Sequence, residues 1–222
     1  MVKRTGLPVI AEVEGLGRVV EVKNDFYNEL LQLKGSGARP ISPRDEAYAR
    51  LMTRGKEDIG RTYGTRTSAG FEYVNGQLPI LRLESRLLTP ELARQAVEAN
   101  RKGHYLSTAS TKEYADSLKQ AEQDKNKEPR ERSVIILPSK SEFKISDKEY
   151  WEIFESIFKD QAKAYFELNG PISVYLANER KIGSQNGTIL SQLWFRDLGC
   201  GSELYGDDGD LDDAYGLRGV LK

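Results

Sequence analysis

The residues that most often carry nucleophilic or metal chemistry are scarce in this chain, which has one cysteine, Cys200, and one histidine, His104. A single cysteine allows neither an intrachain disulfide nor a thiolate zinc site, and a single histidine excludes an HExxH helix. Cys200 lies between two glycines without the local signature of a thiol enzyme. His104 follows a Lys-Gly pair, where the end of a helix is the plainer interpretation. A Cys200–His104 dyad stays open but is not favoured by either neighbourhood.

Other catalytic signatures are missing as well. The sequence contains no GxGxxG, P-loop, GxSxG or kinase motif. Paired carboxylates could be found among so many aspartates in any arrangement, so their presence does not indicate an acid–base pair. We therefore predict a protein that is not an enzyme and holds no cofactor, and keep an enzymatic domain as an alternative.

Carboxylates gather near the C-terminus. From Asp197 to Gly216 the sequence DLGCGSELYGDDGDLDDAYG contains no lysine or arginine. Its oxygens could ligate calcium, but their spacing does not fit an EF-hand loop, so we predict no metal site and keep calcium binding as an alternative. The same composition fits a solvated acidic loop, or a recognition surface whose backbone is rooted by apolar anchors. Those anchors would be Leu198, Leu204, Leu211, Leu217 and Val220.

Charge and apolar pattern weigh against two classes of partner. The net charge of −1 over 222 residues indicates no general attraction to nucleic acid or to an anionic membrane. Apolar runs such as Val134–Leu137 are too short to span a bilayer, and the first ten residues lack an apolar stretch of signal-peptide length. Arg54 to Gly70 mixes arginines, glycines and threonines, yet acids interrupt it, so we expect a long surface loop. We expect a soluble chain without nucleic-acid binding or membrane insertion; virion, cell surface and cytoplasm stay open.

The elements that must position the acidic stretch include several helices. Asp25 and Ser42 are predicted N-caps, the latter followed by Pro43, and Thr89-Pro90 and Thr111 open two further helices. The helix from Thr111 to about Lys127 is mostly polar and is expected to be solvated. Aromatic residues at spacings of three and four predict one amphipathic helix from Ser146 to about Leu168 with a core-facing stripe.

Strands are expected between these helices. Ala11 to Lys23 alternates loosely and breaks at its glycines, and Phe71 to Arg86 has an Asn-Gly pair between two alternating runs, the strongest short-range hairpin signal. Shorter strands are predicted at SVIILP, ISVYLAN and ILSQLWF, where Trp194 and Phe195 are expected in the core. Helices around a mixed or antiparallel sheet make the fold class α+β.

The last thirty residues resemble a known framework. SQLWFR, a leucine-spaced acidic stretch and a terminal Arg218-Gly219-Val220 are similar to the C-terminus of variable proteins from archaeal diversity-generating retroelements. ISPRDEAY, LTPE, KEPRER, SVIILP, DQAKAYFE and VYLANER extend the resemblance over most of the chain. It implies one C-type lectin-like domain over residues 1–222 with peripheral helices. It also implies a hypervariable ligand-binding region at 193–221, in an archaeon or an archaeal virus, that faces a protein or surface ligand of unknown identity.

The same resemblance divides the final segment into two sets. It implies a framework of Leu198, Ser202, Leu204, Gly206, Leu211, Arg218, Gly219 and Val220. Retroelement mutagenesis at adenines cannot reach Lys, Glu, Gln, Met or Trp from an Asn codon, and between Asp197 and Gly216 only Glu203 departs from the reachable set. The implied variable, ligand-binding positions are Asp197, Gly199, Cys200, Gly201, Tyr205, Asp207, Asp208, Gly209, Asp210, Asp212, Asp213, Ala214 and Tyr215.

Overall fold

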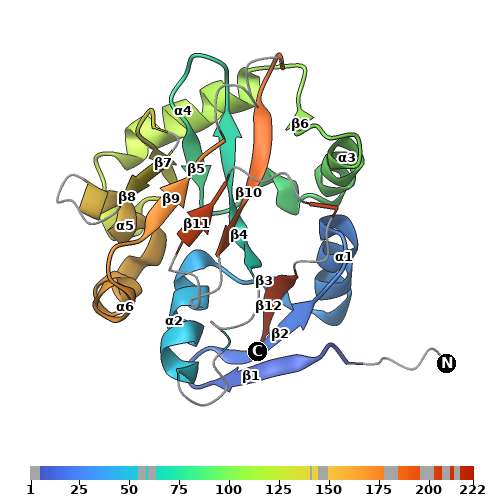
Figure 1. Cartoon of the computed structure of the whole chain (residues 1–222), viewed down its shortest axis with the longest axis vertical. Coiled ribbons are helices and arrows are strands. Elements are labelled where there is room, and N and C mark those ends of the chain that lie inside the picture. Colours follow the sequence, from blue (N-terminus) through green and yellow to red (C-terminus); the bar gives the residue numbers. More distant parts are fainter. Residues whose placement is uncertain are drawn as a thin grey trace.

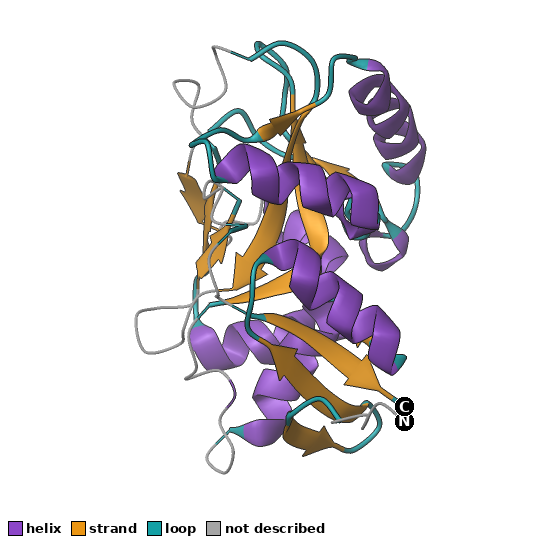
Figure 2. Cartoon of the chain, turned by 90° about the vertical axis from the view of Figure 1, so that its right-hand side faces the viewer, coloured by secondary structure: helices purple, strands orange, loops and turns teal. Residues whose placement is uncertain are grey.

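A mixed sheet with helices around it forms the protein, which confirms the α+β prediction (Figure 1). Figure 2 shows the same strands from the side, with helices lying against them. The computed structural model describes residues 6–54, 59, 64–140, 142–144, 150–177, 185–195, 203–206, 211–212 and 216–222.

The first described segment is a hairpin followed by a helix. β1 (Val9–Val13) pairs antiparallel with β2 (Gly17–Val22), so the strand predicted to break at its glycines is two strands. α1 (Phe26–Ser36) begins at Asp25, whose side chain accepts a backbone N–H of the first turn. The chain leaves α1 at Gly37 with φ 78°, a left-handed conformation that glycine adopts at little cost.

The second helix also begins where the sequence predicts. β3 (Arg39–Pro40) precedes α2 (Pro43–Thr53), and the Ser42 hydroxyl accepts the Asp45 backbone N–H at 3.1 Å. Pro43 stands in the first turn, where its missing N–H costs no helical hydrogen bond. The cap predicted at Ser42 is therefore confirmed.

The segment after α2 contradicts the prediction of a surface loop from Arg54 to Gly70. Thr65–Tyr73 is β4, and all nine of its residues are buried. It pairs with β10 (Ile189–Phe195) and with β5 (Ile80–Arg82). A strand enclosed on both faces can be built from small residues, so its Thr, Ser, Ala and Gly produced no apolar signal. Residues 55–58 and 60–63 of the expected loop lie outside the described residues.

The predicted Asn-Gly hairpin is confirmed, although its connection is longer than two residues. Gly70, Phe71 and Glu72 of β4 pair with Arg82, Leu81 and Ile80 of β5. The turn closes through a hydrogen bond of 3.0 Å from the Gln77 N–H to the Val74 carbonyl, with Gly76 at φ 74°.

The middle of the chain alternates helices with short strands. η2 (Arg86–Leu88), α3 (Pro90–Asn100), β6 (Leu106–Ser107), α4 (Lys112–Asp124), η3 (Pro129–Glu131) and β7 (Val134–Ile136) follow in order. The helix predicted to be solvated is α4, and it does bury one face through Tyr114, Ser117, Ala121 and Asp124. Few of these buried residues are apolar, which is why the sequence predicted a solvated helix.

The predicted amphipathic helix is two helices. α5 (Trp151–Phe158) ends at Lys159, the single-turn η5 (Lys159–Gln161) follows, and α6 (Ala162–Asn169) continues. Lys159 has φ 57° and ψ −129°, outside the helical region. The aromatic stripe is core as predicted, since Phe154, Phe158 and Tyr165 are at most 1% exposed. Of the expected start, residues 146–149 lie outside the described residues.

The C-terminal strands complete the sheet. β8 (Glu142–Lys144), β9 (Ser173–Tyr175), β11 (Glu203–Tyr205) and β12 (Leu217–Leu221) join the order β1-β2-β12-β4-β10-β11-β9-β8. β12 therefore lies between the N-terminal hairpin and the central strand β4 (Figure 1). Within the described part of the chain, no helix is both long and apolar enough to cross a membrane.

Candidate ligand-binding site

The final segment is rooted by its leucines. Leu204, Leu211, Leu217 and Val220 are all between 0% and 4% exposed. Leu204 lies on the inner face of β11, and its neighbours Glu203 and Tyr205 point the other way and are partly exposed. The proposed anchors within the described residues are thus buried, and Leu198 lies outside them.

Gly206 follows β11 at a point where only glycine fits. A Cβ there would lie 2.2 Å from Cε2 of Phe71, which is 1% exposed. The Gly206 N–H donates to the Tyr175 carbonyl at 2.8 Å, and its carbonyl accepts from the Tyr73 and Ser191 hydroxyls at 3.0 and 2.8 Å. These bonds fix the backbone against the core, so the chain leaves β11 in one direction.

Leu211 is the next fixed point. Its carbonyl accepts the Phe26 N–H at 2.8 Å, and its own N–H donates to Oδ1 of Asn100 at 2.9 Å. The side chain packs in a cluster with α1 and α3 residues. Asp212, directly beside it, is exposed. The acidic stretch is therefore tied to the helices at Leu211 while the neighbouring carboxylate faces solvent.

Arg218 anchors β12 through buried charge. Its guanidinium is 0% exposed and donates to Glu21 at 3.1 Å, to Glu46, and to the Ile59 carbonyl at 2.8 Å. Glu46 also pairs with Arg50 at 2.6 Å. Buried carboxylates that lie this close together are stable only when a cation pairs with them. Arg218 supplies that charge and so joins the C-terminal strand to β2 and α2.

A second buried pair supports the start of β12. Arg66 and Glu29 lie 2.8 Å apart, and the Arg66 N–H donates to the Gly216 carbonyl at 3.1 Å. Burial raises the pKa of Glu29 to about 7, and the charge of Arg66 opposes this shift. The start of β12 is thus held by the buried charge of Arg218 and by a backbone hydrogen bond from Arg66, whose own side chain is fixed by Glu29.

Three aromatic side chains lie side by side across β10, β11 and β9. Trp194 is the register partner of Tyr205, and Tyr205 is the partner of Tyr175. Their ring centroids are 5.3 and 4.8 Å apart, the second pair stacked at 14°. The Tyr205 hydroxyl donates to Glu203 at 2.7 Å. The three aromatic residues and Glu203 are all partly exposed. We call Trp194, Tyr205 and Tyr175 the aromatic row, with Glu203 bound to its central tyrosine.

The aromatic row corrects one expectation and adds one residue. Phe195 is core as predicted, but Trp194 is partly exposed because adjacent strand residues point to opposite faces. Tyr175 was missed, although the alternation in ISVYLAN could have placed it on the outer face. Burial, with help from the nearby carboxylates of Glu203 and Glu142, raises the pKa of Tyr175.

Two of the implied variable positions are described, Tyr205 and Asp212, and both reach the surface at least in part. The others lie outside the described residues: Asp197, Gly199, Cys200, Gly201, Asp207, Asp208, Gly209, Asp210, Asp213, Ala214 and Tyr215.

The other chemical candidates divide in the same way. His104 is exposed in the turn after α3, where its N–H donates to the Ala99 carbonyl at 3.1 Å and Gly103 has φ 75°, so the helix-end interpretation is confirmed. Cys200 lies outside the described residues. Within the described part of the chain no cluster of three His, Cys, Asp or Glu side chains could hold a metal ion, but most of the acidic stretch falls beyond it.

Comparison with known proteins decides the fold. No protein-family model matches the chain, and no curated protein sequence matches it. A solved structure does, from work on the accommodation of massive sequence variation in Nanoarchaeota by the C-type lectin fold. It superposes with a TM-score of 0.61 at 14% identity, over 95% of this chain and 100% of that one. The chain has a C-type lectin fold. The fold predicted from the resemblance is therefore correct, and the C-type lectin fold here carries its helices at the periphery of the sheet (Figure 1).

Proposed function

We propose that this chain is a non-catalytic ligand-binding protein whose C-terminal residues are diversified by a retroelement and presented on the C-type lectin fold. The supporting observation is the alternation of roles along the final segment. Leu204, Gly206 and Leu211 are buried and fixed, and Tyr205 and Asp212 between and beside them reach the surface. A surface built in this way can change its contacts without changing its core.

Three further features support the proposal. The solved structure with which this chain superposes belongs to a protein whose C-type lectin fold accommodates massive sequence variation. The aromatic row offers rigid tyrosine and tryptophan contacts of the kind that binding loops use as anchors. β12 joins the sheet between β2 and β4, which fits the proposal of one domain over residues 1–222 and a variable region within 193–221.

The gene tests the proposal most directly. We expect a near-copy of the 3′ end close to a reverse transcriptase, differing from it mainly at template adenines. Those differences should fall in the codons of the implied variable positions and spare the codons of Leu204, Gly206, Leu211 and Arg218. Sibling copies that agree at the implied variable positions would overturn the proposal. The same DNA would test the proposed archaeal or archaeal-viral source.

A binding experiment tests the surface itself. A library randomised at Tyr205 and Asp212, with the framework kept, should yield binders to unrelated protein targets while the members stay folded. A matched library at Gly206 and Leu211 should yield mostly unfolded members. Equal yields of folded protein from both libraries would contradict the division into framework and display.

A further inference from the structure

A cavity of about 580 Å³ lies away from the proposed display segment. Its walls come from β3 and the start of α2, from β5, from α4, and from the segment between η3 and β7 together with the end of α5. Every lining residue falls between Arg39 and Lys159, so none belongs to 193–221. Cavities of roughly 300–1,000 Å³ hold small molecules and cofactors. The size therefore suits one small ligand.

Cations dominate the lining. Five cationic side chains face the cavity against two carboxylates, Glu84 and Glu131. Four of the five cations are arginines, whose planar fork matches the oxygens of a phosphate. Ser68, Ser133 and Gln120 also line the cavity, but their side chains already donate within the protein, to the Leu83 carbonyl and to Asp124. The cationic side chains are Arg39, Arg44, Arg82, Arg132 and Lys159.

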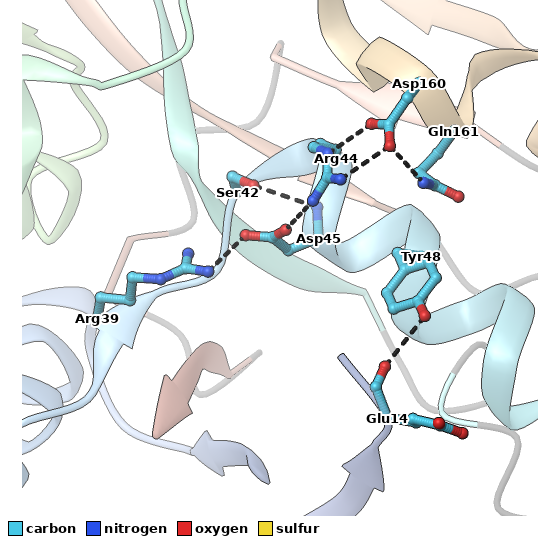
Figure 3. A network of polar contacts seen from close by, with 8 residues as sticks. All are labelled: Glu14, Arg39, Ser42, Arg44, Asp45, Tyr48, Asp160 and Gln161. Atoms are coloured by element: carbon cyan, nitrogen blue, oxygen red, sulfur yellow. Dashed lines mark hydrogen bonds and ion pairs between the residues drawn. The ribbon is translucent and has the colours of Figure 1, made fainter. Parts of the chain in front are cut away.

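Three of these arginines already pair with acids: Arg132 with Glu152 at 2.9 Å, and Arg39 and Arg44 in the network drawn in Figure 3. Arg44 donates to both oxygens of Asp160, at 2.6 and 2.8 Å, and to Asp45 at 3.0 Å. Arg39 pairs with the other oxygen of Asp45 at 2.7 Å. These contacts fix the guanidinium groups before any ligand arrives, which lowers the entropy cost of binding.

Two other cations lack a full countercharge. Nε of Arg82 is buried without a hydrogen-bond acceptor, although another nitrogen of this guanidinium donates to the Ser117 hydroxyl at 3.0 Å. The carboxylate paired with Arg82, Glu72 at 3.7 Å, is shared with Arg86. Lys159 forms no ion pair with any described carboxylate, and its ammonium donates to the Arg132 carbonyl. Burial lowers the pKa of both groups, that of Lys159 to about 8; Asp124 opposes the Lys159 shift and Lys127 adds to it. A bound anion would supply the missing charge.

Lys159 also occupies a strained backbone position. It is the one non-glycine residue of the described chain with a positive φ, at the break between α5 and α6. Glycine would adopt φ 57° and ψ −129° with less strain, so the presence of lysine at this position indicates a role for its side chain. Strain of this kind gathers at functional sites.

The remaining wall is apolar. Leu83, Leu88, Val134 and Ile157 line the cavity beside the cations. A bare inorganic anion gains nothing from such a surface, whereas a ligand with an apolar or planar body does. We propose that this cavity binds a phosphate-bearing small molecule of nucleotide size, with its phosphates on Arg82 and Lys159 and its body on the apolar wall. The site is independent of the proposed display function.

Isothermal titration calorimetry on the full chain with ATP, tripolyphosphate and adenosine tests this site. ATP should bind more tightly than tripolyphosphate, and adenosine more weakly than either. Lys159→Gln should weaken ATP binding at least about tenfold. Lys159→Gly should do the same while relieving the backbone, so a folded protein that has lost binding separates function from stability. Lys163→Gln is the matched control, because Lys163 is 82% exposed and does not line the cavity.

Three outcomes would overturn the assignment. They are no binding of ATP, unchanged ATP affinity in Lys159→Gln, or an equal loss in Lys163→Gln. Single-stranded DNA that binds more tightly than ATP, and loses this binding in Lys159→Gln, would replace the small ligand with a nucleic-acid backbone. None of these results bears on the variable segment, so failure here leaves the proposed function standing.

Discussion

Replacing Gly206 with alanine is the sharpest test of a fixed framework beneath a changeable surface. The added Cβ would lie 2.2 and 2.3 Å from two carbons of the Phe71 ring, where ordinary contacts begin at 3.4 Å. The ring or the strand must therefore move by about 1.2 Å. Neither has room, since Phe71 is 1% exposed and both polar groups of Gly206 are hydrogen-bonded.

The magnitude follows from this overlap. Overpacking a well-filled core costs about 1–3 kcal/mol, and a site that cannot relax falls at the upper end. Strain on the hydrogen bonds to Tyr73 and Ser191 adds to the cost. We expect Gly206→Ala to lose about 3–4 kcal/mol of unfolding free energy. For a chain of this length that lowers the melting temperature by roughly 6–16 °C.

Urea denaturation followed by circular dichroism measures the loss, with three comparison variants. Gly35→Ala is the matched control, because Gly35 lies in α1 with nothing within 4 Å of its added Cβ, and it should be neutral or stabilising. Asp212→Ala should change stability by less than about 0.5 kcal/mol and Tyr205→Asn by about 1 kcal/mol. A Gly206→Ala loss below about 1 kcal/mol, or losses in Tyr205→Asn and Asp212→Ala that equal it, would refute the reasoning.

Three further outcomes are expected. Arg218→Met should cost about 3–5 kcal/mol in urea denaturation because it removes the buried cation that Glu21 and Glu46 share, and a loss under about 1 kcal/mol would contradict the anchoring role. Against the effect of burial, hydrogen bonds from Lys127 and Ser133 hold the pKa of Asp124 well below its usual range. Its stabilisation is therefore present at neutral pH and is lost as the pH falls below about 4, so the stability gap to Asp124→Asn should shrink in acid; a constant gap would be inconsistent with this. ATP affinity should fall as the pH rises through about 8, where Lys159 loses its proton beside Asp124 and Lys127, and calorimetry on Lys159→Gln should show no such fall.

Local signals predicted local structure well. The caps at Asp25 and Ser42, the Asn-Gly hairpin and the strand ILSQLWF are all present, because each depends on neighbours within a few residues. The resemblance at the C-terminus indicated the fold, and Leu204, Leu211 and Leu217 are buried as the interpretation with apolar anchors predicted. Successive side chains of an extended chain point to opposite faces, so buried and surface positions can be predicted from their order in the sequence.

Long-range packing produced the errors. The first part of β4, Thr65–Gly70, was predicted as a loop because it contains mostly small and polar residues, which become buried only when β4 pairs with β5, β10 and β12. The helix predicted from Ser146 to Leu168 breaks at Lys159, and nothing in a lysine announces a positive φ. Trp194 lies on the outer face beside Tyr205, because it alternates with the buried Phe195 along β10.

The sequence by itself therefore determined the helix starts at Asp25 and Ser42, the Asn-Gly hairpin, the α+β class and the buried leucines of the last segment. Only the tertiary structure decided that Arg218 neutralises Glu21 and Glu46, and that Gly206 lies against Phe71. It also decided that residues from Arg39 to Lys159 surround a cationic cavity. The reason is physical: a charge, a small residue or a cavity wall acquires its role from partners that lie far away along the chain.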